Sequence, residues 1–227
     1  PDRKTRDILK QKRDSGFDPY LSVKIQREPL SAYEQGLKRA LDVSLSASSL
    51  ALLAPLFVIV AALIKLDSPG PVFFRQRRCG FDNREFLIWK FRSMRVLENG
   101  PHIPQAHRND SRVTAVGRVL RRTSIDELPQ LINVLRGEMS LVGPRPHALA
   151  HDELYGRAIA EYSLRHHVKP GLTGVAQVLG YRGETRTVED MEKRVQYDIW
   201  YANNWSIWLD IRLIAQTFVA LMRHEAY

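Results

Sequence analysis

The chain has 227 residues, a formal net charge of +9 and 44% hydrophobic residues. This length suffices for one domain with a sizeable buried core. The positive charge favours an anionic partner, such as a nucleic acid, a phosphorylated substrate or an anionic lipid headgroup. We rank nucleic acid last and expect no nucleic-acid partner, because the sequence has no zinc-finger spacing and no aromatic RNA-binding motif. The single cysteine, Cys79, excludes an internal disulfide and a metal site built on cysteines, and it fits a reducing compartment.

Residues 1–36 form a charged arm at the start of the chain, in which no apolar periodicity is sustained. We interpret this arm as solvated and loosely ordered, and a basic arm lying on an anionic membrane is the alternative. The chain begins at Pro1 rather than Met, so the sequence leaves open whether a further N-terminal domain precedes it.

Residues 37–66 are predicted to be the membrane element. Val43 to Ile64 carries no charged residue and is long enough to cross a hydrocarbon core, which needs roughly 20 apolar residues. Pro55 removes the helical hydrogen bond to the carbonyl of Ala51, so the helix should bend there. Positive charge prefers the cytoplasmic side, and both flanks are basic. The pattern therefore favours a helix that enters, bends and leaves on one face, although a kinked single span fits it equally well. The flanking cations are Lys38, Arg39, Lys65, Arg75, Arg77 and Arg78.

A β-hairpin is predicted after the membrane segment. Val72–Phe74 and Glu85–Phe91 are rich in β-formers, and turn-forming residues separate them. The first arm continues to Arg78 and the second carries Lys90. A strand that displays cations at alternate positions can line a phosphate site, and a solvated basic hairpin is the alternative.

The stretch Leu120–Pro146 brings arginines and an adjacent pair of acids together within a short distance along the chain. Two arginines precede an adjacent pair of acids, a short apolar-periodic run follows, and an arginine then stands between two prolines. Cations, paired acids and a proline-locked arginine are typical of a site that handles phosphates. The residues are Arg121, Arg122, Asp126, Glu127 and Arg145.

The acid pair has a structural and a functional interpretation, which are compatible. Ser124-x-x-Glu127 fits a capping box, and Gly137 fits the C-terminal stop of the following helix. A carboxylate that faces several arginines stays ionised well below neutral pH, so Asp126 can act as a nucleophile. The neighbouring Glu127 can hold a hard divalent cation.

The remainder of the chain is predicted to be largely helical. Ala148–His167 and Thr187–Tyr201 have helical patterns, and Ile211–Met222 forms an amphipathic helix. Between them, Lys169–Gly174 is a tight loop that can present backbone N–H groups to a phosphate, or a plain turn. Aromatic residues near the last helix indicate a membrane interface, and an ordinary core helix is the alternative. These aromatics are Trp200, Tyr201, Trp205 and Trp208.

Five motifs in this order resemble the monotopic phosphoglycosyl transferases, the bacterial sugar transferases that start exopolysaccharide and O-antigen assembly. The resemblance runs from about Leu37 to Tyr227. The motifs are KFRSM (Lys90–Met94), RTSIDELPQ (Arg122–Gln130), SLVGPRP (Ser140–Pro146), KPGLTGVAQV (Lys169–Val178) and NWSIWLD (Asn204–Asp210).

The resemblance implies an α+β, mainly helical fold at the inner membrane of a bacterium. Residues 37–66 would form a re-entrant membrane helix-loop-helix, and residues 67–227 one catalytic domain on the cytoplasmic face, with a small β-hairpin and interfacial amphipathic helices. Many family members have serine before the bend proline, whereas this chain has Ala54, so Ser48 or Ser49 would have to bond the freed backbone group.

The resemblance also implies a reaction, in which hexose 1-phosphate passes from a UDP-sugar to undecaprenyl phosphate. Asp126 would carry the covalent phosphosugar after UMP leaves, and Glu127 would hold Mg²⁺. Gly180–Asp198 looks most like members that transfer glucose 1-phosphate, with galactose next. Arg145 would contact a substrate phosphate. The other substrate-binding residues would be Lys90, Arg78, Arg121 and Gln177.

Two other function classes fit part of the sequence. A membrane scaffold for polysaccharide assembly, without chemistry, would explain the basic charge and the interfacial helices. An enzyme that glycosylates the lipid directly would release UDP instead of UMP. Anionic inner-leaflet lipids are expected partners in each case, and the sequence does not separate a monomer from a homodimer.

Overall fold

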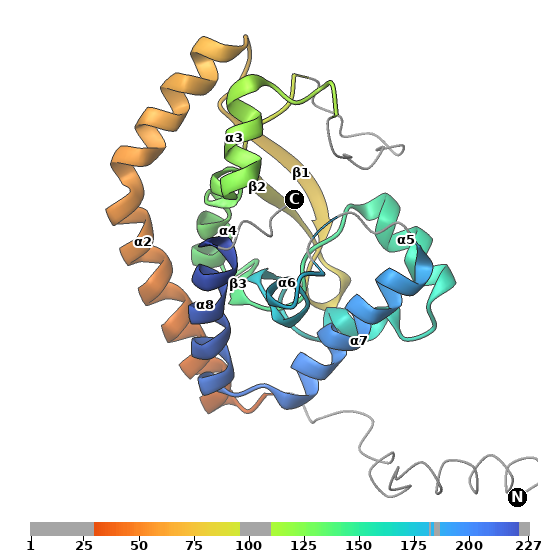
Figure 1. Cartoon of the computed structure of the whole chain (residues 1–227). Helices are drawn as coiled ribbons and strands as arrows, with labels where there is room; N and C mark the ends of the chain where they lie inside the picture. Colours follow the sequence, from red (N-terminus) through yellow and green to blue (C-terminus); the bar gives the residue numbers. More distant parts are fainter. Residues whose placement is uncertain (1–29, 96–109, 182, 184–186, 223–227) are drawn as a thin grey trace, which may run out of the picture. The chain divides into compact units, whose positions relative to one another are not determined.

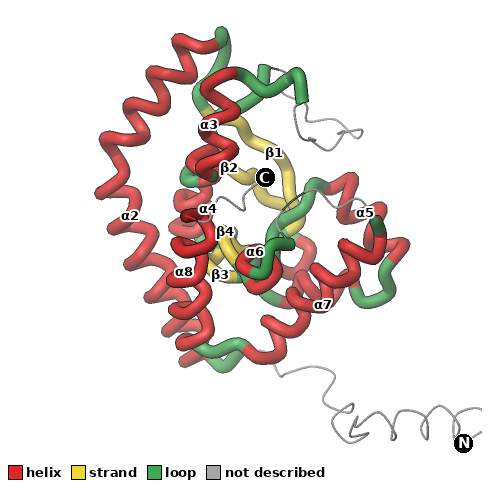
Figure 2. The backbone as a smooth tube through the Cα atoms, in the orientation of Figure 1, coloured by secondary structure: helices red, strands yellow, loops and turns green. Residues whose placement is uncertain are grey.

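The computed structural model describes residues 30–95, 110–181, 183 and 187–222. The predicted arm therefore lies outside the described residues as far as residue 29. The described part is mostly helical and contains two small two-stranded sheets, which agrees with the predicted α+β, mainly helical class (Figures 1 and 2).

One unbroken helix, α2 (Ala32–Asp67), occupies the predicted membrane segment. It begins with a capping box, in which Ser31 Oγ accepts from the Glu34 N–H at 3.3 Å and the Glu34 carboxylate accepts from the Ser31 N–H at 2.9 Å. Pro55 lies inside the helix, so the loop predicted there is wrong. A proline costs one backbone bond, and a helix that is apolar on both sides of it can absorb that loss by bending. Figure 1 shows α2 as a bowed rod.

By length and composition, α2 is able to cross a membrane, and it is the one such helix among the described residues. Much of its surface stays uncovered, because Leu52, Val58 and Leu66 are 80%, 71% and 85% exposed. A continuous apolar surface of this kind marks contact with lipid or with another protein.

The predicted hairpin is confirmed, with a longer first strand. β1 (Phe73–Cys79) pairs antiparallel with β2 (Glu85–Phe91), and Phe73 stands opposite Phe91. The connecting turn holds Asp82 and Asn83 at φ angles of 54° and 57°, a region that short polar residues tolerate.

The C-terminal half of α2 packs against this hairpin. Val60 and Ile64 are buried with Phe91 of β2 and Leu120 of α3 (Ala115–Thr123). The ring of Phe57 also meets that of Phe91 edge-on, with centroids 4.9 Å apart. Helix α2 is therefore part of the folded core at this end.

The acid pair lies in a short 3₁₀ helix, η3 (Ile125–Glu127), between α3 and α4 (Gln130–Arg136). The predicted capping box is wrong, because Ser124 has a left-handed φ of 59° and its side chain caps no helix. The chain turns sharply at Ser124 to leave α3, which takes the hydroxyl away from the following N–H groups. Gly137, at a φ of 82°, ends α4 as predicted.

The rest of the chain forms short strands and helices around the acid pair. The helix predicted over 148–167 is split in two. The helices predicted over 187–201 and 211–222 are confirmed, with the end of the first and the start of the second displaced by a few residues. The elements are β3 (Ser140–Val142), α5 (Leu149–Ala158), η4 (Tyr162–His167), β4 (Gly171–Thr173), α6 (Val175–Val178), α7 (Val188–Asn204) and α8 (Ile207–Met222).

The segment Lys169–Gly174 is not a plain turn. Its centre is β4, which pairs parallel with β3. The Gly171 N–H donates to the Pro144 carbonyl at 2.8 Å, so the fold itself uses this donor. A Cβ at Gly143 would stand 2.3 Å from the Lys169 carbonyl oxygen, so this close approach requires glycine.

Candidate functional site

Both acids of the pair are buried at the junction of α3 and α4. The exposed fractions of Asp126 and Glu127 are 8% and 5%. Acids at this depth require cations or hydrogen-bond donors, because burial otherwise disfavours the charged form.

Two cations from different elements meet Glu127. Lys90 of β2 places Nζ 2.8 Å from Oε1. Arg145, in the segment after β3, places Nη2 2.6 Å from Oε1 and Nη1 3.0 Å from Oε2. A two-pronged guanidinium–carboxylate pair fixes the direction of the arginine as well as its distance.

The pocket around the acid pair is both charged and buried. Burial lowers the pKa of the Lys90 ammonium, and the negative charges of Glu127 and Asp126 act in the opposite direction. Asp126 is thus close enough to the cations to interact with them. The arrangement gives a charged, largely dry pocket in which electrostatic interactions are strong.

The other predicted site residues lie at different distances from the pair. Arg78 donates to the side-chain oxygen of Gln76, and its charge interacts with those of Arg145 and Glu127. Arg121 donates to Met94 Sδ at 3.7 Å. Gln177 donates to the Leu172 carbonyl at 2.9 Å. The structure thus brings Lys90, Arg78 and Arg145 to the acids, whereas Arg121 contacts Met94, which follows β2.

An apolar cavity of about 400 Å³ adjoins the acid pair. Side chains of α2, α4, α6 and α8 line it, with Glu127 and Gln177 among the few polar groups. Much of its wall is made of Leu45, Leu52, Leu131, Ile214 and Phe218. The site therefore joins a charged pocket to an apolar space beside the membrane helix.

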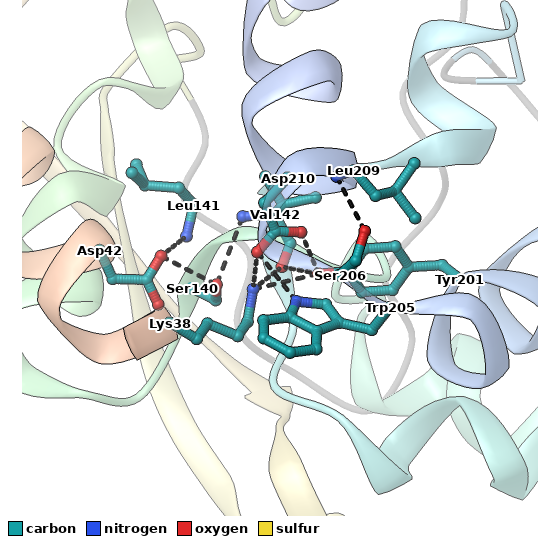
Figure 3. A network of polar contacts seen from close by, with 10 residues as sticks. All are labelled: Lys38, Asp42, Ser140, Leu141, Val142, Tyr201, Trp205, Ser206, Leu209 and Asp210. Carbon is teal, nitrogen blue, oxygen red and sulfur yellow. Dashed lines mark hydrogen bonds and ion pairs between the residues drawn. The ribbon is translucent and has the colours of Figure 1, made fainter. Parts of the chain in front are cut away.

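A buried polar network fixes the strand that leads to Arg145 (Figure 3). Lys38 of α2 forms an ion pair of 2.6 Å with Asp210 of α8. The same Lys38 ammonium donates to the Val142 carbonyl at 3.1 Å and to the Tyr201 hydroxyl at 3.0 Å. Trp205 completes the group by donating to Asp210 at 3.0 Å. The membrane helix and the last two helices are thereby tied to β3.

A second contact from α2 holds the other end of β3. Asp42 accepts from the Ser140 hydroxyl at 3.0 Å and from the Leu141 N–H at 2.9 Å (Figure 3). In addition, Arg39 donates to the Val134 and Leu135 carbonyls at 2.5 and 2.6 Å, which satisfies the C-terminal end of α4. The N-terminal part of α2 thus positions both halves of the site.

Arg165 of η4 supports Arg145 from behind. Its Nη2 donates to the Arg145 carbonyl at 2.6 Å and forms an ion pair of 2.9 Å with Asp198. Arg165 is only 2% exposed. The Arg145 carbonyl is therefore held by a guanidinium that is almost completely buried.

Sequence reasoning missed these supporting residues, which lie far apart along the chain. A signal exists for Asp198, and for Arg194 on the same face of its helix. Met191 and Val195 mark the buried face of α7, and Arg194 and Asp198 fall on that same face at helical spacing. Charged residues on an apolar face indicate buried partners. Lys38, Asp42 and Arg165 give no such signal.

The acid pair fits one kind of metal site. No group of three or more metal-ligating side chains occurs in the described part of the chain. Mg²⁺, however, is commonly held by one or two carboxylates together with substrate phosphates. Both Glu127 oxygens already meet cations, so the ion would share the pocket with them.

Comparison with known proteins identifies similar sequences over nearly the whole described part. Residues 33–224 match the family model of bacterial sugar transferases. A relative from Escherichia coli (strain K12) is 53% identical over 206 residues, which is 90% of this chain and 44% of that protein. One from Klebsiella pneumoniae is 48% identical over all of this chain and 49% of its own length. One from Caulobacter vibrioides is 55% identical over 82% of this chain and 69% of its own length.

All three relatives are named UDP-glucose:undecaprenyl-phosphate glucose-1-phosphate transferase. The chain spans somewhat less than half of the Escherichia coli and Klebsiella pneumoniae proteins.

Proposed function

The chain belongs to the bacterial sugar transferase family, and from this premise we propose that it transfers a hexose 1-phosphate from a UDP-sugar to undecaprenyl phosphate. The observation that carries the proposal is the buried acid pair, whose Glu127 is bonded by Lys90 and by both prongs of Arg145. Such a cluster suits a diphosphate because it offers a nucleophile and concentrated positive charge in one place.

In the first step, an Asp126 carboxylate oxygen attacks the sugar-bearing phosphorus of the donor. A new P–O bond forms to the carboxylate, and the bond between that phosphorus and the bridging oxygen breaks. The electron pair leaves with UMP, whose phosphate gains a negative charge. Arg145 and Lys90 stabilise the charge that develops on the phosphate oxygens.

In the second step, an oxygen of undecaprenyl phosphate attacks the phosphorus held on Asp126. The acyl-phosphate bond breaks, the carboxylate is restored, and undecaprenyl-diphospho-sugar is released. The apolar cavity supports this step, because it lies beside Glu127 and beside the exposed apolar surface of α2. The two substrates can thus reach the acids from a charged side and an apolar side.

Glu127 is proposed to hold Mg²⁺ together with the donor diphosphate. When bound, the ion supplies charge neutralisation for the phosphates. The chain's own groups orient the donor, since Arg145 is fixed by Arg165 and Lys90 by its pair with Glu127.

The family and the long apolar helix indicate a membrane protein. We place the catalytic part on the cytoplasmic face of the inner membrane, with α2 entering one leaflet and returning to the same side. Contacts at both ends of α2 support this placement. Lys38 pairs with Asp210 near one end, and Arg92 donates to the Ser68 carbonyl at 2.6 Å just beyond the other. A helix that crossed the bilayer would have its ends on opposite sides.

UDP-glucose is the proposed donor, as in the names of the three relatives. The assay combines the purified chain with UDP-glucose, Mg²⁺ and undecaprenyl phosphate and identifies the nucleotide released. We expect UMP, and we expect none from Asp126→Asn. UDP would indicate direct glycosyl transfer, and no release across a panel of donors would favour the scaffold.

A further inference from the structure

A second cluster of positive charge surrounds His147, on the side of Arg145 remote from the apolar cavity. It draws on Arg78 of β1, Arg165 of η4 and Arg194 of α7, none of whose elements lines that cavity. His147 is 7% exposed and Arg194 6% exposed. The cluster therefore sits inside the fold, next to the residue that also bonds Glu127.

The imidazole of His147 can be assigned a single neutral form. Burial, followed by the charges of the surrounding arginines, holds its pKa well below the ordinary value of 6.5. Arg165 Nη1 lies 2.7 Å from Nδ1, and a guanidinium can only donate. Nδ1 is therefore the acceptor, and Nε2 carries the proton. That Nε2–H is buried and has no hydrogen-bond partner among the described residues.

The guanidinium groups of Arg78 and Arg194 also have fewer hydrogen-bond partners than they could use. Each makes one hydrogen bond to a neutral oxygen, from Arg78 to Gln76 and from Arg194 to the Gly183 carbonyl at 2.9 Å. Within the described part of the chain, the buried Nε of each has no partner and no carboxylate lies within ion-pair distance. Burial lowers the pKa of both guanidinium groups to about 10.

Arg165 shows the contrast. It is buried more deeply, yet it pairs with Asp198 at 2.9 Å and lies 3.7 Å from Asp152. Arg78 and Arg194 have no such close pair, because the carboxylates that act on their charges, Asp152 and Glu127 for Arg78 and Asp198 for Arg194, lie beyond ion-pair distance. Holding a guanidinium largely out of water without a close carboxylate partner is costly. Two such groups, with Arg78 partly and Arg194 almost fully buried, beside an unpaired N–H indicate a place for an anion that is bound later.

We propose that Arg78, Arg194 and His147 form the subsite for the phosphate of the nucleotide half of the donor, the phosphate that leaves as UMP. This inference rests on the proposed function for the identity of the nucleotide. The chemistry recognised is a phosphate, for which forked guanidinium groups are well suited.

Position favours the nucleotide over the lipid as the source of that phosphate. Arg145 stands between the two regions, since it bonds Glu127 and its carbonyl is held by Arg165. The apolar cavity on one side suits a lipid tail. The His147 cluster on the other side is polar and enclosed, which suits the water-soluble nucleotide.

The test is equilibrium binding of UMP to the purified full chain, measured by calorimetry for the wild type and variants. Arg194→Gln removes the charge, and we expect it to weaken UMP binding about tenfold or more. Arg194→Lys keeps the positive charge but lacks the forked guanidinium, and it should recover part of the lost UMP affinity. His147→Asn leaves an amide oxygen for Arg165 but removes the Nε2 donor, and it should weaken binding a few-fold. Arg157→Gln is the matched control, because the Arg157 side chain is 80% exposed.

Farnesyl phosphate, a short polyprenyl phosphate, is titrated in parallel. Its affinity should be unchanged by Arg194→Gln, which also shows that the variant is folded. The inference is overturned if the wild type does not bind UMP, if both the Arg194→Gln and His147→Asn variants bind UMP like the wild type, or if Arg194→Gln weakens farnesyl phosphate alone.

The two proposals can fail separately. A wild-type chain that binds UMP through Arg194 but releases no UMP from UDP-glucose would refute the reaction and leave the subsite in place. A chain that releases UMP, but whose Arg194→Gln and His147→Asn variants both keep full UMP affinity, would refute the subsite and leave the reaction in place.

Discussion

Arg145 contributes a direction as well as a charge. Its two prongs reach both oxygens of Glu127, and prolines on either side restrict its backbone. We predict that Arg145→Lys lowers kcat/KM for UDP-glucose about tenfold or more, roughly 1.4 kcal/mol, because an ammonium cannot make the forked contact. UMP release measures this, with Arg157→Lys as control. Equal activity of the two variants would show that charge alone suffices.

His147 also makes stability depend on pH. Its pKa is ordinary in the unfolded chain and lowered in the folded one, so the unfolded chain binds more protons once the pH falls below about 6.5. Stability is therefore lost as the pH falls through and below that value, by at most about 1.4 kcal/mol per pH unit.

Thermal inactivation midpoints between pH 7.5 and 5.5 test this expectation. The midpoint of the wild type should fall toward acid pH, and that of His147→Asn should fall less. Burial also lowers the pKa values of His151 and His166, so part of the slope should survive in the variant. A variant slope as steep as the wild-type slope would contradict the role given to His147.

At the scale of elements, the ion pair between Lys38 and Asp210 joins α2 to α8. Both side chains are nearly enclosed, with 11% and 1% exposure. Asp210→Asn leaves the buried Lys38 charge without its ion-pair partner, and we predict a loss of roughly 3–5 kcal/mol in unfolding free energy.

The exposed pair of Arg77 and Glu85 gives the matched control. These side chains are 68% and 51% exposed, and their atoms are 3.4 Å apart. Glu85→Gln should change stability by no more than about 1 kcal/mol. Denaturant unfolding in one detergent compares the two variants, and similar losses would show that the network of Figure 3 does not tie the helices together.

Elements with a clear period were predictable, and those set by long-range contacts were not. The hairpin and helices α7 and α8 follow from residue patterns. Strands β3 and β4 are too short to show a period, and they exist because Gly143 and Gly171 let two backbones approach. The capping rule at Ser124 misled because a sharp turn overrides it. At Pro55 the residue pattern predicts only a bend, and the loop that the resemblance implied is replaced by a continuous helix.

The candidate site was predictable only where its residues belong to a local sequence pattern. Asp126, Glu127 and Arg145 stand within one stretch of sequence, and Lys90 belongs to a recognisable strand. His147 follows Arg145 closely in the sequence. Arg194 could not be placed beside them without the fold, because α5, η4, β4 and α6 separate it from them along the chain.

At the scale of the whole molecule, membrane placement is the property to test. If α2 returns to the side that it entered, its two ends share one compartment. We predict that cysteines placed at Tyr33 and at Leu66, which are 79% and 85% exposed, both react with an impermeant maleimide from the cytoplasmic side. The background is Cys79→Ser. Labelling of the two positions from opposite sides would establish a span.

The most direct test of the account is to trap the covalent intermediate. The chain is incubated with UDP-glucose and Mg²⁺ without lipid, and its peptides are analysed by mass spectrometry. We predict one hexosyl phosphate on Asp126, formed as UMP appears and lost on addition of undecaprenyl phosphate. Turnover without any adduct, or an adduct on a different residue, would contradict the account.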